Sequence, residues 1–178
     1  MLLLQFTGLS GSGKTTLAAR LQKDLAERGF AAKVIDGDVY RKTVCKDLGF
    51  SAADRKENIR RLALIADDYC RQGTIAIIAA INPFEESRRE IAERYGAITV
   101  WLRCPLPVLL ARDPKGLYRR ALLPDNDPQK IFNFTGINDP YEEPTGADLV
   151  IDTGTADVAA ASKQLLDFVL TKLKNRLH

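Results

Sequence analysis

The segment "FTGLSGSGKTTLAARL", residues 6–21, decides the fold, because an apolar run, a glycine-rich turn and a helical pattern follow one another within it. Residues 8–15 match G-x-x-x-x-G-K-[ST], in which glycines let the backbone fold tightly and turn its N–H groups inward. The helix that follows adds the positive end of its dipole. We therefore predict a phosphate-binding loop, in which Lys14 reaches the outer phosphates and the Thr15 hydroxyl ligates Mg²⁺.

This loop occurs in three kinds of protein: a GTP-driven switch, an ATP-driven machine and a small kinase. A switch usually reads guanine through an N-K-x-D segment, which the chain lacks, and "DPKG", 113–116, comes too late to be a switch segment. A machine usually brings further domains, whereas this chain has 178 residues. Short length and a long insertion favour a kinase, whose predicted nucleotide-binding residues are Gly8, Leu9, Ser10, Gly11, Ser12, Gly13, Lys14, Thr15 and Thr16.

Apolar runs alternate with helical patterns along the chain. Helices are predicted at 14–28, from a capping box at 51–54 onward, at 85–94 (charged and exposed) and at 156–173; strands are predicted at 2–6, 33–35, 74–81, 97–102 and 147–152. Such alternation is typical of a parallel sheet covered by helices on both faces. We predict an α/β, P-loop NTPase-type three-layer fold with a five-stranded parallel sheet, in a single domain over residues 1–178.

Residues 113–146 interrupt this alternation, because they place many prolines, glycines and charges between the last two strands. A long polar insertion of this kind is usually either a lid or disordered. Its aromatic residues favour an ordered lid; they are Tyr118, Phe132, Phe134 and Tyr141.

The composition narrows the partners and the compartment. The net charge is +3 and no Lys/Arg stripe stands out, which argues against a nucleic-acid partner. Three widely spaced cysteines indicate free thiols in a reducing cytoplasm, and neither a signal-peptide pattern nor an apolar run of about 20 residues is present. We expect a cytoplasmic protein without a membrane segment. Because the one histidine is His178, the last residue, we expect a catalytic base other than imidazole.

Two carboxylates follow the second predicted strand, in "VIDGDVYR", 34–41. Ligands of open α/β sheets bind beyond the carboxyl ends of the strands, so Asp36 and Asp38 should face the phosphate loop. One carboxylate, assigned to Asp36, is expected to hold Mg²⁺ through water, and Asp38 to accept the proton of an attacking hydroxyl. The alternative is that Asp38 only caps the next helix.

The next segment, "KDLGFSAADRKENIRR", 46–61, offers an anion site. Arg55 and Asn58 share one helix face, and Arg41 with Arg55 suits an anion, while Phe50 suits a base. The alternative is solvated arginines and a core phenylalanine.

The sequence resembles the adenylylsulfate kinase (APS kinase) family from Leu4 to about Asp152. The motifs that carry the resemblance are "FTGLSGSGKTT", "DGD" with Arg41, "DLGFSAADRKENIRR", "NPFEESR", "RDPKGLY" and "FTGINDPYEEP". The resemblance implies a P-loop kinase with a lid, often a homodimer. It also implies transfer of the γ-phosphoryl of ATP, with Mg²⁺, to the 3′-hydroxyl of adenosine 5′-phosphosulfate.

Carried over to this chain, the resemblance implies that the phosphate loop holds ATP and that Asp38 faces the 3′-hydroxyl. It implies that Phe50 and Phe134 sandwich the substrate adenine and that Lys115 lies near the anions. The implied substrate-binding residues are Asp38, Arg41, Phe50, Arg55, Asn58, Ile81, Asn82, Lys115 and Phe134, and the catalytic pair is Asp38 and Lys14.

The chain departs from the family pattern at three places. Asn82 stands where many members have a serine that becomes phosphorylated in some, so we expect direct in-line transfer without a phosphoenzyme there. Glu85 replaces a usual arginine and inverts a charge near the expected anion site, with Arg88 available to compensate. Residues 122–134 form a longer stretch than usual. The alternatives are a related kinase for another nucleotide or small hydroxyl compound, and a non-catalytic nucleotide-gated binding protein.

Overall fold

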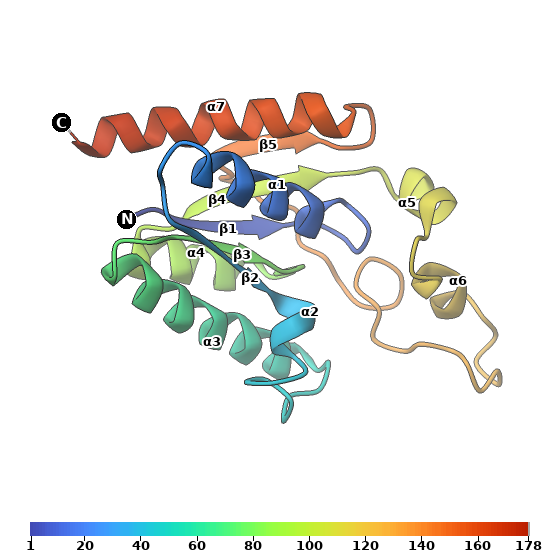
Figure 1. Ribbon diagram of the computed structural model, residues 1–178. Helices are drawn as coiled ribbons and strands as arrows, with labels where there is room; N and C mark the ends of the chain where they lie inside the picture. The colour runs from blue at the N-terminus through green and yellow to red at the C-terminus, as the bar shows by residue number, and fades with distance from the viewer. Residues whose placement is uncertain (178) are drawn as a thin grey trace.

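A computed structural model describes residues 1–177 (Figure 1). Five strands form one parallel sheet in the order β2-β3-β1-β4-β5. Their bounds are β1 Leu3–Thr7, β2 Ala32–Asp36, β3 Ile75–Ala79, β4 Ile98–Arg103 and β5 Leu149–Asp152. The α/β prediction of a five-stranded parallel sheet is therefore confirmed, with strand ends shifted by at most two residues.

Helices cover both faces of the sheet. Figure 1 shows α1 and α7 on one side and α3 and α4 on the other, while α2, α5 and α6 lie beyond the carboxyl ends of the strands. The helices are α1 Lys14–Ala26, α2 Gly37–Tyr40, α3 Ala52–Arg71, α4 Glu85–Tyr95, α5 Leu106–Arg112, α6 Leu117–Ala121 and α7 Val158–Leu177. The three-layer prediction is confirmed, and the short helices α2, α5 and α6 were not predicted.

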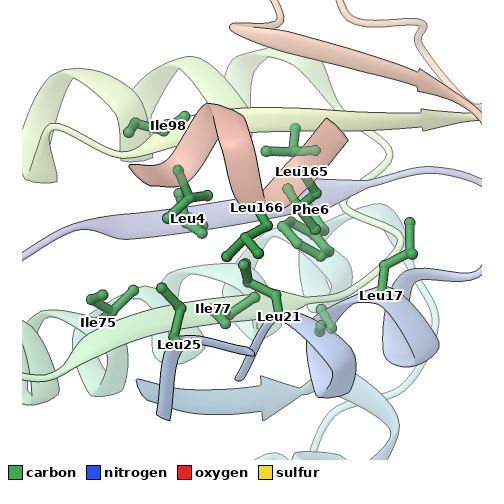
Figure 2. Close-up of a cluster of buried hydrophobic side chains, with 14 of the residues drawn as sticks. Leu4, Phe6, Leu17, Leu21, Leu25, Ile75, Ile77, Ile98, Leu165 and Leu166 are labelled. Carbon is green, nitrogen blue, oxygen red and sulfur yellow. The ribbon is translucent and has the colours of Figure 1, made fainter. Parts of the chain in front are cut away.

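The larger core cluster lies between the sheet and the helices α1 and α7 (Figure 2). The predicted one-turn spacing of Leu17, Leu21 and Leu25 places all three side chains against the sheet, where they are at most 2% exposed. Leu4 and Phe6 of β1 belong to the same cluster and lie on the sheet face that α1 covers, because alternate residues of a strand face one side. This packing fixes the start of α1, and with it the phosphate loop.

The second core cluster lies under α3 and α4. The N-cap half of the predicted capping box is observed, since the Ser51 hydroxyl accepts a hydrogen bond from the Asp54 N–H (3.1 Å). The Asp54 carboxylate accepts from the Ser51 hydroxyl (2.7 Å) and not from the Ser51 backbone N–H. The prediction that α4 is an exposed helix is wrong for one of its faces. Arg88 is only 2% exposed and Ile91 is 3% exposed, because this face packs on the sheet.

The insertion (residues 113–146) packs on a third cluster, which consists of Cys104, Leu109, Tyr118, Ala121 and Phe134. Its buried aromatic residues give the segment an ordered position beside the phosphate loop. Whether the insertion moves as a lid stays a prediction. Among residues 1–177, no helix combines the length and the apolar character that a bilayer span requires.

Candidate active site

The phosphate loop joins β1 to α1, and its shape depends on glycine. Gly8 has φ +149°, and a Cβ there would lie 2.5 Å from the Leu102 carbonyl oxygen of β4. Gly13 has φ +90° at the start of α1, a conformation that glycine adopts without strain. The predicted loop is therefore formed in full, with strand before it and helix after it.

Lys14 lies inside this loop and is 9% exposed. Its Nζ donates hydrogen bonds to the carbonyl oxygens of Gly8 (2.8 Å) and Leu9 (2.7 Å). Burial lowers the pKa of Lys14 from 10.5 to about 7, while the carboxylate of Asp38 opposes this change and Lys115 adds to it. The ammonium group thus sits where added negative charge would stabilise it strongly.

Asp36 connects the phosphate loop to the turn after β2. Its Oδ2 accepts a hydrogen bond from the Thr15 hydroxyl (2.7 Å), and its Oδ1 accepts from the backbone N–H groups of Asp38 (2.9 Å) and Val39 (3.3 Å). The residue that caps α2 is therefore Asp36, and the alternative that Asp38 is the cap is wrong. Capping by Asp36 leaves the Asp38 carboxylate free to face the site.

The Thr15 hydroxyl and the Asp36 carboxylate are hard oxygen donors of the kind Mg²⁺ prefers. No cluster of three or more His, Cys, Asp or Glu side chains suited to a metal occurs within residues 1–177. Mg²⁺ does not need one, because it keeps several waters and binds nucleotide phosphates through one or two protein groups. The residues present therefore fit this ion.

Asp38 lies where two cavities meet. One cavity, of about 200 Å³, is lined by the phosphate loop, Asp36 and Lys115; the other, of about 70 Å³, is lined by the predicted anion site. Asp38, Ala80 and Ile81 line both. The second cavity brings together seven predicted substrate-binding residues, namely Asp38, Arg41, Phe50, Arg55, Asn58, Ile81 and Asn82. We call them the nucleotide cavity and the acceptor cavity.

Lys115, from the insertion, reaches this junction. Its Nζ lies 2.6 Å from Asp38 Oδ2, although both side chains are more than half exposed. A cation is thus held against the carboxylate that faces both cavities.

Two arginines and an exposed ring shape the acceptor cavity. The guanidinium groups of Arg41 and Arg55 lie 4.6 Å and 5.5 Å from the centroid of the Phe50 ring, which is 56% exposed. Arg55 is 8% exposed and also donates to the carbonyl oxygen of Asn133. Neither a core Phe50 nor a solvated Arg55 is therefore observed.

Phe134 is the one predicted substrate-binding residue that lines neither cavity. Its ring packs edge-on against Tyr118, with centroids 5.0 Å apart, and it is 8% exposed. The adenine sandwich between Phe50 and Phe134 stays a prediction.

Asn82 and Glu85, the two departures from the family pattern that follow β3, have separate structural roles. Asn82 adopts φ +45°, and its Nδ2 donates to Gln5 Oε1 (3.1 Å), while its Oδ1 is buried without a partner among the described residues. Glu85 accepts hydrogen bonds from Arg88 (2.6 and 2.9 Å) and from the Thr145 hydroxyl (2.9 Å). Arg88 thus compensates the charge of Glu85, as expected, and Glu85 itself does not line the acceptor cavity.

A third cavity, of about 310 Å³, lies on the other side of the phosphate loop, between α1 and the turn before α7. Its residues outside the loop were not predicted from the sequence; they include Arg112, Thr153, Ala156, Asp157 and Val158. The available signal was "DTGTAD", 152–157, a polar turn directly after a buried strand. Arg112 is held there by a hydrogen bond to the Thr153 carbonyl oxygen (2.9 Å).

Comparison with known proteins agrees with this geometry. The family model described as adenylylsulphate kinase matches residues 1–152. A probable adenylyl-sulfate kinase of Bacillus subtilis is 45% identical over 174 residues, covering 96% of this chain and 86% of the relative. An adenylyl-sulfate kinase of Bacillus pumilus is also 45% identical, over 97% of this chain and 86% of the relative.

A solved structure shares both sequence and fold. The Mycobacterium tuberculosis APS kinase CysC, in complex with AMPPNP and APS, has a TM-score of 0.86 and 36% identity, with 94% of this chain and 96% of that chain covered. Shikimate kinase from Acinetobacter baumannii, at 17% identity and a TM-score of 0.59, shares the fold alone. The matched family model and the relatives at 45% identity establish that this chain belongs to the adenylylsulphate kinase family.

Proposed function

We propose that this protein transfers the γ-phosphoryl group of ATP to the 3′-hydroxyl of adenosine 5′-phosphosulfate, giving 3′-phosphoadenosine 5′-phosphosulfate and ADP. The observation that carries the proposal is the position of Asp38, the one carboxylate residue among residues 1–177 that lines both the nucleotide cavity and the acceptor cavity. A kinase needs one group at the meeting point of donor and acceptor. Family membership supplies the choice of substrate, and the M. tuberculosis relative was solved with AMPPNP and APS.

On the donor side, the phosphate loop binds the triphosphate through its backbone N–H groups and Lys14. The adenine of ATP occupies the third cavity, beside Arg112 and the turn before α7. Thr15 and Asp36, whose side chains are hydrogen-bonded to each other (2.7 Å), would hold Mg²⁺. When bound, this ion neutralises charge on the phosphates.

On the acceptor side, Arg41, Arg55 and Asn58 bind the phosphosulfate and the sugar. Guanidinium groups suit such an anion because they donate two parallel hydrogen bonds. The enclosed 70 Å³ holds only part of this substrate, and the exposed Phe50 ring continues the site outward as a surface for adenine.

Transfer is direct and in line. The 3′-oxygen forms a bond to the γ-phosphorus as the bond to the β,γ-bridging oxygen breaks, and ADP keeps that electron pair. Asp38 accepts the hydroxyl proton, while Lys14 and Lys115 stabilise charge on the oxygens of the moving phosphoryl group. Lys115 must release Asp38 for this step, since the two are paired at 2.6 Å. Asn82 is not a phosphate acceptor, so no phosphoenzyme forms at that position.

An assay with γ-labelled ATP and Mg²⁺ tests the proposal. Label in 3′-phosphoadenosine 5′-phosphosulfate, formed from adenosine 5′-phosphosulfate, supports it. Label in another nucleotide or sugar from a panel identifies a related kinase, and ATP binding without transfer to any acceptor identifies a binding protein. Either of the last two results would reject the proposed substrate or the proposed chemistry.

We also propose that the protein works in the cytoplasm as a homodimer. The three cysteines are free thiols, which suits a reducing compartment. A hexameric APS kinase from Thiobacillus denitrificans has 29% identity and a TM-score of 0.67, with 98% of this chain but 29% of that chain covered, so a larger assembly is the alternative to a dimer. Light scattering after gel filtration distinguishes a dimer from a monomer or a hexamer.

A further inference from the structure

The phosphate loop contacts the insertion at two points. The Tyr118 hydroxyl of α6 donates a hydrogen bond to the Ser10 carbonyl oxygen (2.8 Å). The Leu9 side chain packs on Gly136, where a Cβ would lie only 2.6 Å from Leu9 Cδ2. Gly136 belongs to a tight turn at residues 133–139, which we call the insertion turn. A displacement of the phosphate loop therefore acts on both α6 and this turn.

Tyr118 has a second contact at the other end of its side chain. It is 1% exposed, and its ring packs edge-on against Phe134 at 5.0 Å with an interplanar angle of 89°. Burial raises the pKa of Tyr118 far above its ordinary value, and Cys104 and Asp113 add to this, so the hydroxyl stays protonated and donates. The hydroxyl is thus fixed to the phosphate loop and the ring to the insertion turn.

The insertion turn also holds Arg55, a residue of the acceptor cavity. The carbonyl oxygen of Asn133 and the carboxylate of Asp139 (3.3 Å) both accept from Arg55 Nη2. The turn is braced internally, because Asn138 Oδ1 accepts from the Phe134 N–H. Arg55 is 8% exposed and lines the acceptor cavity. Its guanidinium position therefore depends on where the insertion turn lies.

We propose that Tyr118 is a positioning residue that couples nucleotide binding at the phosphate loop to substrate binding at Arg55. The inference rests on the proposed function for the identity of the two ligands. The coupling runs from Ser10 through Tyr118 and Phe134 to the turn that holds Arg55. Tyr118 lines neither the nucleotide cavity nor the acceptor cavity, so it acts through these neighbours.

The coupling should be positive, so that each ligand raises the affinity for the other. Nucleotide phosphates fix the loop, the fixed loop holds Tyr118, and the insertion turn is then ordered before the second ligand arrives. Substrate binding to an already ordered site costs less conformational entropy, so the two ligands favour each other. By linkage, AMPPNP should raise the affinity for adenosine 5′-phosphosulfate by the same factor by which adenosine 5′-phosphosulfate raises the affinity for AMPPNP.

The variant Tyr118→Phe tests this, because it removes the hydrogen bond to Ser10 and keeps the ring against Phe134. Calorimetry measures the affinity for adenosine 5′-phosphosulfate with and without saturating AMPPNP. AMPPNP should tighten binding to the wild type, and in Tyr118→Phe this coupling factor should fall about fivefold, which corresponds to about 1 kcal/mol and to one ordinary hydrogen bond. The affinity without nucleotide should change by less than about twofold.

Tyr95→Phe is the matched control. Its hydroxyl is buried without a partner among the described residues, at the end of α4 and away from both cavities. This variant should keep the wild-type coupling factor. An unchanged factor in Tyr118→Phe, or an equal loss in Tyr95→Phe, would overturn the role of Tyr118.

Hydrogen exchange on the wild type with AMPPNP alone needs neither a variant nor the second ligand. The nucleotide should slow amide exchange in residues 131–139, and this protection should shrink in Tyr118→Phe. No protection in the wild type would overturn the coupling. If the protection is absent but labelled product still forms, the coupling is wrong and the proposed function stands. If the protection appears but adenosine 5′-phosphosulfate neither binds nor reacts, the proposed function is wrong.

Discussion

Lys115 Nζ lies 2.6 Å from Asp38 Oδ2, so the proposed proton acceptor is paired with a cation that comes from a segment 77 residues away in the sequence. Asp38 faces both cavities, and Lys115 lines the nucleotide cavity. The pair is open to solvent, with side-chain exposures of 73% and 57%. Because an exposed ion pair contributes little to stability, we expect this pair to matter for catalysis.

Replacing Lys115 by methionine separates the contribution of the pair to catalysis from its contribution to stability. The free energy of unfolding in urea should change by less than about 1 kcal/mol, as for other exposed pairs. Turnover with adenosine 5′-phosphosulfate should fall by about 10- to 100-fold, because a charge that stabilises the transferring phosphoryl group is lost. Lys163→Met, at an exposed position of α7, is the control and should alter neither quantity. Full turnover in Lys115→Met would refute the role of the ammonium group.

Replacing Asp38 by asparagine keeps the shape of the side chain and removes its basicity. Turnover should drop about 10²-fold or more, since general base catalysis is worth that much, while ATP affinity stays within about twofold. Asp68→Asn, at an exposed position of α3, controls for the loss of a surface charge. Steady-state kinetics and calorimetry measure the two effects. Unchanged turnover would show that Asp38 does not handle the proton.

The pKa of Lys14 predicts proton uptake when ATP binds. Burial lowers this pKa to about 7 in the folded protein, so most Lys14 side chains are neutral at pH 8. Phosphates favour the ammonium form, and binding at pH 8 should therefore take up about one proton per ATP. Calorimetry in two buffers with different ionisation enthalpies measures the uptake, and Lys14→Met should abolish it. An uptake near zero in the wild type would contradict the low pKa.

The same group contributes to the pH dependence of stability. Between pH 7 and about 10.5 the unfolded chain binds a proton at Lys14 that the folded protein lacks, so this group makes stability rise with pH across that window. Below pH 7 both states are protonated, and the full cost of burying the charge remains. Urea unfolding at pH 7 and pH 9 should show a larger gain in the wild type than in Lys14→Met. Equal gains in the two proteins would argue against the buried, neutral lysine.

Glu85 should matter for stability and not for substrate choice. It pairs with Arg88, which is 2% exposed, and Glu85 itself is about one third exposed. Glu85→Gln should destabilise the protein by about 1–2 kcal/mol, less than a fully buried pair, because Arg88 keeps its bonds to the carbonyl oxygens of Asn82 and Glu142. The KM for adenosine 5′-phosphosulfate should stay within about twofold. A large change in KM with unaltered stability would place Glu85 in the acceptor site after all.

The sheet, the first helix and the phosphate loop were predictable from the sequence, because the patterns that specify them are local. Leu17, Leu21 and Leu25 recur at one-turn spacing, and the loop motif lies within eight consecutive residues. The acceptor cavity followed from a family resemblance that assigns roles to positions far apart in the chain. Burial of Arg55 in that cavity agrees with this assignment.

Other features depend on contacts that no local pattern encodes. Arg88 is buried through bonds to Asn82 and to Glu142, which lies 54 residues away, so the charged sequence of α4 suggested a solvated helix. The third cavity joins α1 to Arg112 and to the turn before α7, and it has no motif of its own. The alternative that Asp38 caps the next helix is wrong, because the backbone N–H groups of Asp38 and Val39 both donate to Asp36, which caps α2.

The central claim is that Asp38 contacts the oxygen that receives the phosphoryl group. A crystal structure of the protein with Mg²⁺, AMPPNP and adenosine 5′-phosphosulfate tests it most directly. We predict that the 3′-hydroxyl lies within hydrogen-bond distance of the Asp38 carboxylate and in line with the γ-phosphorus, with Lys115 moved onto the phosphates. A complex in which Asp38 remains paired with Lys115, while the 3′-hydroxyl points away from the phosphate loop, would contradict the account.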